Sequence, residues 1–208
     1  MEVKNLKGTR EFILYALGHI RGCTLDLGAG KAKYKDIIKR SADEYIAFDM
    51  VVGDNVDVVG DINETGFSAD FFDTVVCTQV FEHIPKPWMA AKEIHRILKS
   101  GGVCIVTAPF IQASHADPYD YFRYTPQGLS SLFEGREFEI LDSGAYGKIA
   151  STLLDFIKMI WFSPYKKPVR GSWRFIRMLV GLGFWLDRFT SSEVVYGNSY
   201  IIAKKTIS

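Results

Sequence analysis

Short apolar runs alternate with amphipathic stretches along most of the chain. Runs typical of buried strands occur at 23–27, 45–48, 56–59, 74–78, 103–107, 137–143 and 199–204. Helical spacing of apolar residues is found at 10–21, 31–40 and 87–99. Thr125-Pro126 predicts the start of a further helix, capped by the threonine. Strands that alternate with helices predict βαβ units, and therefore a doubly wound α/β domain with a parallel sheet.

Two further helix ends are predicted. Thr9 is expected to cap the helix at 10–21, and Gly101 with Gly102 is expected to end the helix at 87–99. The sequence contains neither an internal repeat nor a low-complexity tract. We therefore expect a single domain over residues 1–208, with an N-terminal helix in residues 1–22.

Composition favours an ordinary globular protein. The chain has 208 residues, of which 48% are hydrophobic and 24% charged, with a formal net charge of +1. This balance argues against a general polyanion binder and against an acidic disordered chain. The three cysteines Cys23, Cys77 and Cys104 are odd in number and lie in apolar stretches, which predicts reduced thiols, and their spacing does not suggest zinc. Because the first residues lack an apolar signal core, we expect a cytoplasmic protein.

The first strand ends in a glycine loop that is preceded by an acid, Asp26-Leu-Gly-Ala-Gly30. Glycines here allow a ligand to approach the backbone closely. A dinucleotide-binding fingerprint would have a third glycine where this chain has Lys33. Asp26 suits a ligand with a cationic amino group, Asp49 ends the next strand where an acid accepts ribose hydroxyls, and Asp61 ends the third and suits an exocyclic amine. A tight turn flanked by solvated acids is the structural alternative.

Together these segments resemble class I S-adenosylmethionine-dependent methyltransferases of the type 11 family. The resemblance rests on LDLGAG at 25–30, AFDM at 47–50, GDI at 60–62, FDTVVCTQVFEHIPKP at 72–87 and KEIHRILKSGGVCIVTAPF at 92–110. It covers 23–144 and returns at 198–205, so these two ranges form the expected core. It implies a Rossmann-like sheet of seven strands whose last strand is antiparallel.

The resemblance also implies S-adenosyl-L-methionine as the cofactor and assigns residues to its parts. Asp26, Gly28 and Gly30 would flank the methionine portion, Asp49 would hold the ribose, and Asp61 with Ile62 would meet the adenine. The remaining residues implied at the cofactor are Ala29, Met50 and Gln79.

A second polar cluster follows the fifth strand, at His115 to Thr125. Loops that leave the carboxyl ends of parallel strands line the ligand site of such sheets. The pattern H-x-x-P-x-D-x-x-R-x-T resembles a subgroup of the same family that is linked to glycan or lipid biosynthesis. His115 and His83 are candidate bases for a hydroxyl acceptor, with Asp120 and Arg123 as further catalytic candidates. The alternative is a loop held by its own Asp120–Arg123 pair.

Residues 145–197 form a long connection where a tight hairpin would suffice. Residues 1–144 carry 15 basic and 21 acidic side chains, whereas residues 145–208 carry 10 basic and 3 acidic ones. The patterns at 149–162 and 173–189 predict helices, interleaved with basic and aromatic residues. In the resembling fold this connection lies over the active-site face. It is a lid, a peripheral membrane element through 149–186, or a dimer surface.

The sequence therefore predicts methyl transfer to a small or lipid- or glycan-linked biosynthetic acceptor, through O- or N-methylation. A non-catalytic S-adenosylmethionine-binding regulatory or partner protein is the alternative, and a dehydrogenase is a weaker one. We expect no resident metal and no nucleic-acid partner, and a monomer or homodimer.

Overall fold

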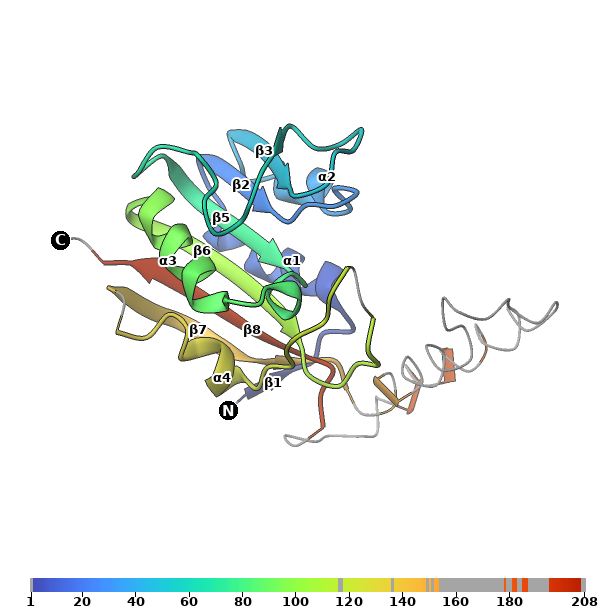
Figure 1. Cartoon of the computed structure of the whole chain (residues 1–208). Helices are drawn as coiled ribbons and strands as arrows, with labels where there is room; N and C mark the ends of the chain where they lie inside the picture. The colour runs from blue at the N-terminus through green and yellow to red at the C-terminus, as the bar shows by residue number, and fades with distance from the viewer. Residues whose placement is uncertain are drawn as a thin grey trace.

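The computed structural model describes residues 2–115, 118–135, 137–148 and 195–206, together with 150, 152–153, 178, 181–182 and 185–186. Its centre is a mixed sheet of eight strands in the order β1-β7-β8-β6-β5-β2-β3-β4 (Figure 1). The strands are β1 (Glu2–Lys4), β2 (Cys23–Leu27), β3 (Glu44–Asp49), β4 (Val58–Val59), β5 (Phe72–Thr78), β6 (Leu98–Pro109), β7 (Phe138–Tyr146) and β8 (Asn198–Lys205).

The directions of the strands decide where a ligand can bind. Strands β2 to β6 pair in parallel, whereas β8 lies antiparallel between β6 and β7. The carboxyl ends of β2, β3, β4, β5 and β6 therefore meet at one edge of the sheet, where open α/β sheets bind their ligands. The predicted doubly wound sheet with an antiparallel last strand is confirmed. Strand β1 is an addition that was not predicted, and it pairs in parallel with β7.

Helices cover both faces of the sheet. Helix α1 (Thr9–Ala16) and α2 (Lys35–Ile38) pack with one buried cluster, and α3 (Pro87–Ile97) and α4 (Pro126–Ser130) pack with the other (Figure 1). Neighbouring residues of β5 pack into different clusters. Val75 and Cys77 belong to the cluster with α3 and α4, and Val76 belongs to the cluster with α1 and α2. A parallel strand buried on both faces explains why β5 reads as a continuous apolar run.

Several predicted helix boundaries are wrong. Helix α1 begins at Thr9 with Gly8 at its N-cap, because the Thr9 hydroxyl lies 3.0 Å from the Tyr146 hydroxyl instead of capping the helix. The helix expected at 31–40 is limited to Lys35–Ile38, because Ala32 adopts a positive φ of 49° that a helix does not allow. At the start of α4 the predicted cap is confirmed, since the Thr125 hydroxyl accepts from the Gly128 N–H at 3.0 Å.

The predicted glycine end of the helix at 87–99 is also wrong. Helix α3 ends at Ile97, and the chain enters β6 at Leu98, which pairs with Phe72 of β5. Gly101, with a φ of 77°, therefore lies inside the strand segment.

The predicted insertion starts and ends at the ligand edge of the sheet. Since β7 is antiparallel to β8 and β8 to β6, β7 runs in the same direction as β6, and its Tyr146 pairs with Asn198 at the start of β8. Most of residues 145–197 lie outside the described residues, and this includes most positions of the helices expected at 149–162 and 173–189. Among the residues that are described, no helix is both long and apolar enough to cross a bilayer.

Candidate functional site

The glycine loop makes a sharp turn between β2 and α2. The N–H groups of Gly28 and Ala29 both donate to the Phe48 carbonyl of β3, at 2.8 and 3.0 Å. Gly28 has a φ of 79°, and a side chain there would lie 2.4 Å from a methyl carbon of Val80. Gly30 has a φ of 53°, and a Cβ there would meet no atom within 4 Å. The loop therefore brings bare backbone to an open space at the sheet edge.

Asp49, at the end of β3, connects this loop to the neighbouring strand. One carboxylate oxygen accepts from the Gly30 N–H at 2.8 Å, and the other accepts from the Val51 N–H at 3.0 Å. Each carboxylate oxygen keeps a lone pair that these bonds do not use. Asp49 is therefore held in place by the backbone and remains able to accept from two ligand hydroxyls.

Asp26 is the acid beneath the glycine loop. Its side chain is 3% exposed and accepts a hydrogen bond from the Tyr45 hydroxyl at 2.7 Å. Burial raises the pKa of Asp26 to about 6, against the opposing effect of the Tyr45 hydrogen bond. A buried carboxyl that is costly to ionise alone is suited to pair with a cationic ligand group.

The other predicted cofactor residues lie at the same edge. Asp61 accepts from the Asn63 N–H at 2.8 Å, Ile62 packs against the core, and Met50 is 65% exposed. Gln79 follows β5 with a φ of 57°, and its amide donates to the Thr107 hydroxyl of β6 at 3.0 Å.

The loop that joins β6 to α4, residues 110–125, is held by an ion pair. Arg123 donates to both carboxylate oxygens of Asp120, and Asp120 also accepts from the His115 N–H at 2.9 Å. The Arg123 guanidinium holds the pKa of Asp120 well below its usual range. Arg123 donates further to the carbonyls of Gln112 and Ala113. The structure thus shows the Asp120–Arg123 pair that was considered as the alternative to a catalytic role.

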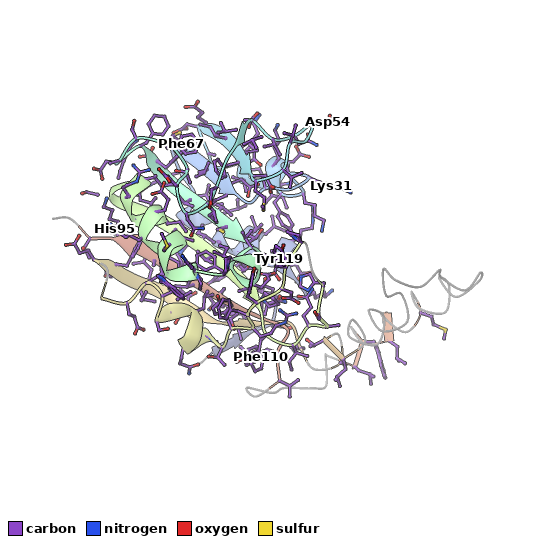
Figure 2. All side chains as sticks on the ribbon, viewed as in Figure 1. Lys31, Asp54, Phe67, His95, Phe110 and Tyr119 are labelled. Atoms are coloured by element: carbon purple, nitrogen blue, oxygen red, sulfur yellow. The ribbon has the colours of Figure 1, made fainter. Side chains whose placement is uncertain are left out.

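The 110–125 loop is also fixed onto the short 3-10 helix Phe81–His83 that follows β5. The Tyr121 N–H donates to the Glu82 carbonyl at 2.7 Å, and the Tyr124 hydroxyl donates to the Phe81 carbonyl at 3.2 Å. In the view of Figure 2, Tyr119 of this loop lies between Lys31, which follows the glycine loop, and Phe110, which follows β6.

These contacts bring His83 and His115 together over a buried acid. The two imidazole rings lie 5.1 Å apart at an interplanar angle of 83°. Beneath them, the Glu82 side chain is fully buried, and neither of its oxygens has a hydrogen-bond partner among the described residues. Burial raises the pKa of Glu82 to about 8. Glu82 belongs to the motif at 72–87, but nothing in the sequence pattern indicates a role for it.

The predicted site residues therefore form two groups on one sheet edge. The glycine loop and the acids of β2 to β4 form one group, and His83, His115, Asp120 and Arg123 form the other, at the ends of β5 and β6. The remaining histidines lie elsewhere, since His95 on α3 stacks edge-on with Phe138 and His19 ends the helical turn after α1.

The sheet order, the antiparallel β8 and the glycine loop with strand-end acids are those of class I methyltransferases. Residues 25–106 match the type 11 family model, described as a methyltransferase domain. Residues 25–106 thus carry a methyltransferase domain, and this match together with the fold supports the predicted class I S-adenosylmethionine-dependent methyltransferase. No curated protein sequence matches the chain.

Solved structures match over almost the whole chain at low identity. A SAM dependent methyltransferase from Archaeoglobus fulgidus is 18% identical, with a TM-score of 0.63 and 95% of each chain covered. An S-adenosylmethionine dependent methyltransferase from Mesorhizobium loti is 12% identical, with a TM-score of 0.59, and the match covers 95% of this chain and 98% of that one. The [4+2]-cyclase SpnF is 16% identical, with a TM-score of 0.62 over 96% of this chain and 81% of its own. At these identities the likeness describes the fold.

The residues present fit S-adenosylmethionine. The open space at Gly30 admits a ligand to the backbone, and the buried Asp26 carboxyl matches an amino group. Asp49 is oriented by two backbone N–H groups and keeps free lone pairs for hydroxyls. The cofactor predicted from the resemblance therefore agrees with the family match and with the local chemistry.

Proposed function

We propose that this methyltransferase acts on an oxygen or nitrogen atom of a small or lipid- or glycan-linked biosynthetic acceptor. The observation that carries the proposal is the pair of imidazoles, His83 and His115, on the same sheet edge as the glycine loop. S-adenosylmethionine supplies an electrophilic methyl group. A hydroxyl or ammonium acceptor must in addition lose a proton, and a neutral imidazole is suited to take it.

On the cofactor side, each residue has a proposed partner. Asp26 faces the amino group of the methionine portion, and Gly28, Ala29 and Gly30 leave space for its chain. Asp49 accepts from the ribose hydroxyls, while Met50, Asp61 and Ile62 surround the adenine and Gln79 lies between cofactor and acceptor. Supporting this assignment, Asp49 is already oriented toward the loop by the Gly30 and Val51 N–H groups.

On the acceptor side, we assign different tasks to charged and imidazole groups. Asp120 and Arg123 bind each other and the loop backbone, which suits positioning residues. The imidazoles of His115 and His83 are partly exposed, with 27% and 18% of their side chains accessible, so an acceptor can reach them. Holding the acceptor atom in line with the methyl group provides most of the rate in such a transfer.

A lipid- or glycan-linked acceptor is supported by the surroundings of the loop. Tyr119 and Tyr121 are 62% and 47% exposed and present aromatic faces with hydroxyl groups. Such amphipathic rings are suited to sugar rings and to membrane-interface head groups. The basic excess of residues 145–208 would favour an acceptor that carries phosphate.

The test has two stages. Calorimetric titration with S-adenosylhomocysteine should show micromolar or tighter binding, whereas NAD(H) should not bind. The protein is then incubated with S-adenosylmethionine and pools of hydroxylated or aminated sugars and lipid-linked sugars, and products heavier by one methylene unit are sought by mass spectrometry. Binding without any methylated product from these pools would favour the non-catalytic alternative, and absence of binding would refute cofactor use altogether.

A further inference from the structure

The Glu82, His83 and His115 side chains place three acceptor groups around one point. One ligand atom from each residue lies within 4.8 Å of the others. The Nε2 atoms of His83 and His115 are 3.7 and 3.9 Å from the same oxygen of Glu82, Oε1. These separations are too long for hydrogen bonds, so the three atoms face one another without a shared proton.

The other ring nitrogens show which atoms are free. The Nδ1 of His83 lies 2.5 Å from the Tyr119 carbonyl, and the Nδ1 of His115 lies 3.2 Å from the Ala113 carbonyl. Carbonyls only accept, so each Nδ1 carries a proton, and each ring in its neutral form presents its Nε2 lone pair to Glu82. Metal-binding histidines typically have this arrangement, with the second nitrogen donating to a backbone carbonyl.

The Glu82 carboxyl lacks the polar partners that a buried carboxyl group normally has. Its side chain is fully inaccessible, and within the described part of the chain neither oxygen has a hydrogen-bond partner. A buried acceptor without a partner costs free energy, and a buried carboxylate costs more unless a cation is beside it. Arg123 is already committed to Asp120 and to loop carbonyls. A cation between Glu82 and the two imidazoles would satisfy all three groups at once.

We propose that Glu82 Oε1, His83 Nε2 and His115 Nε2 bind one divalent transition-metal ion of the zinc type. Two imidazoles and one carboxylate are the ligands of known three-residue metal sites that keep a coordination position open. A tetrahedral ion with bonds of about 2.0–2.1 Å separates its ligand atoms by about 3.4 Å, so the observed atoms need only small side-chain movements. Magnesium and calcium prefer oxygen ligands and fit this set poorly. This proposal departs from the expectation of no resident metal that was made from the sequence.

The open position would give the ion a role in the proposed methyl transfer, and this role rests on that proposed function. An acceptor hydroxyl bound there would ionise more easily, because a metal ion lowers the pKa of a coordinated oxygen. With the ion bound, the two Nε2 atoms are ligands and no longer serve as bases. Metal binding itself needs neither the cofactor nor an acceptor, so it can be tested independently of the proposed function.

The experiment titrates the full-length chain, freed of metal by a chelator that is then removed, with Co²⁺ at neutral pH. We expect one Co²⁺ per chain, visible absorption bands of the protein-bound ion, and their loss when Zn²⁺ is added but not when excess Mg²⁺ is added. The ligand variants are His115→Ala, on the loop surface, and Glu82→Gln, which keeps the buried shape. Each should raise the dissociation constant more than about 100-fold, beyond what loss of an outer partner causes.

The matched control is His19→Ala, which removes a histidine far from the cluster in the sequence and should bind Co²⁺ as the unchanged chain does. Circular dichroism spectra of all variants confirm that they fold. Absence of Co²⁺ binding to the unchanged chain, or binding that survives in both His115→Ala and Glu82→Gln, would overturn the proposal. In that case Glu82 is a buried carboxylic acid that stays protonated.

Discussion

At the scale of single residues, Asp49 is the side chain on which cofactor affinity should depend most. Asp49→Ala removes a carboxylate that two backbone N–H groups hold in place for the ribose hydroxyls. We expect cofactor binding to weaken by about 2–3 kcal/mol, the scale of lost hydrogen bonds to a charged group. Calorimetric titration with S-adenosylhomocysteine measures the change. Asp54→Ala, on the exposed stretch after β3, is the control and should bind normally; an unchanged affinity for Asp49→Ala would contradict the assignment.

Asp26 is expected to favour cofactor binding and, at neutral pH, to lower the stability of the cofactor-free protein. Burial raises its folded-state pKa to about 6 from an ordinary value of 3.8, so the ionised form is penalised in the folded protein. The favourable contribution of the protonated group is complete below the unfolded-state pKa and is lost as pH rises through about 6. Asp26→Asn removes this loss, and the Asn oxygen still accepts from the Tyr45 hydroxyl.

We therefore expect Asp26→Asn, without cofactor, to be about 2–3 kcal/mol more stable than the unchanged chain at neutral pH. The stabilities of the two proteins should become equal at a pH below the pKa of the Asp26 carboxyl in the unfolded chain. Urea denaturation over this pH range measures the difference, and S-adenosylhomocysteine should bind the variant more weakly. Equal stability at neutral pH would show that Asp26 ionises without penalty in the folded chain.

At the scale of elements, the 110–125 loop depends on the ion pair between Asp120 and Arg123. Asp120 is 5% exposed, and Arg123→Gln would leave its carboxylate without the cation that lowers its pKa. We expect a loss of about 1–3 kcal/mol in stability at neutral pH, because a nearly buried charge loses its partner. The native contribution of a carboxyl with a lowered pKa disappears as pH falls, so the two proteins should become similar in acid.

Limited proteolysis and urea denaturation test this loop prediction. Cleavage within 110–125 should be faster in Arg123→Gln, while S-adenosylhomocysteine affinity stays within about twofold, because the cofactor residues lie on other strands. Lys86→Gln, on the exposed stretch before α3, is a charge-matched control. If Arg123→Gln abolished cofactor binding, the loop would belong to the cofactor site instead.

A related prediction concerns His115 itself. His115→Ala should leave S-adenosylhomocysteine affinity within about twofold and abolish turnover once an acceptor is known, whether the imidazole serves as base or as ligand. The two roles separate in the dependence on metal, because a bound metal ion shifts the pH profile of turnover with the metal used, whereas the profile of a metal-free base does not change with the metal supplied. Normal turnover in His115→Ala would remove this residue from the acceptor site.

Sequence patterns predicted the strands better than the helix ends and the loop packing. Strands buried on both faces, such as β5, require apolar runs, and such runs can be recognised from the sequence alone. Strand β1 has three residues without such a run, and it forms because β7 offers an edge to pair with. The helix at 31–40 shortened because the backbone at Ala32 follows the tight glycine loop, which local propensity does not reveal.

The same distinction holds for the site. Asp26 and Asp49 could be predicted because strand ends of a parallel sheet meet at one edge, whatever the details. The burial of Glu82 depends on the 110–125 loop folding back over the 3-10 helix, through the bonds of Tyr121 and Tyr124 to its carbonyls. That contact joins residues far apart in the sequence, so no local pattern indicated that Glu82 would lie beneath two histidines.

At the scale of the whole molecule, the connection from β7 to β8 is placed to influence the acceptor side. Its two ends, Tyr146 and Asn198, pair at the sheet edge where the 110–125 loop also begins. The N–H groups of Phe110 and Ile111 donate to the Gly197 carbonyl, and the Phe110 ring stacks on Tyr196 at 4.7 Å. A change in this connection would thus act directly on the loop that carries His115.

The basic excess of residues 145–208 gives two testable roles for that connection. As a lid, it should become resistant to proteolysis within 149–186 when S-adenosylhomocysteine or product is bound, and anionic liposomes should have no effect. As a peripheral membrane element, it should bind anionic liposomes in a salt-sensitive manner, because each Lys or Arg near such a surface contributes about 1 kcal/mol and is screened by ions.

We expect the lid behaviour, because the connection begins and ends beside the acceptor loop. Limited proteolysis with and without S-adenosylhomocysteine, together with liposome sedimentation at low and high salt, separates the two roles. Replacing Lys166, Lys167 and Arg170 with Gln is the matched variant, since it removes charge from the connection and leaves the described core unchanged. Under the lid role this variant keeps its ligand-dependent protection; under the membrane role it is released from liposomes. Resistance to protease without ligand, combined with indifference to lipid, would contradict both roles and would favour a packed insertion or dimer surface.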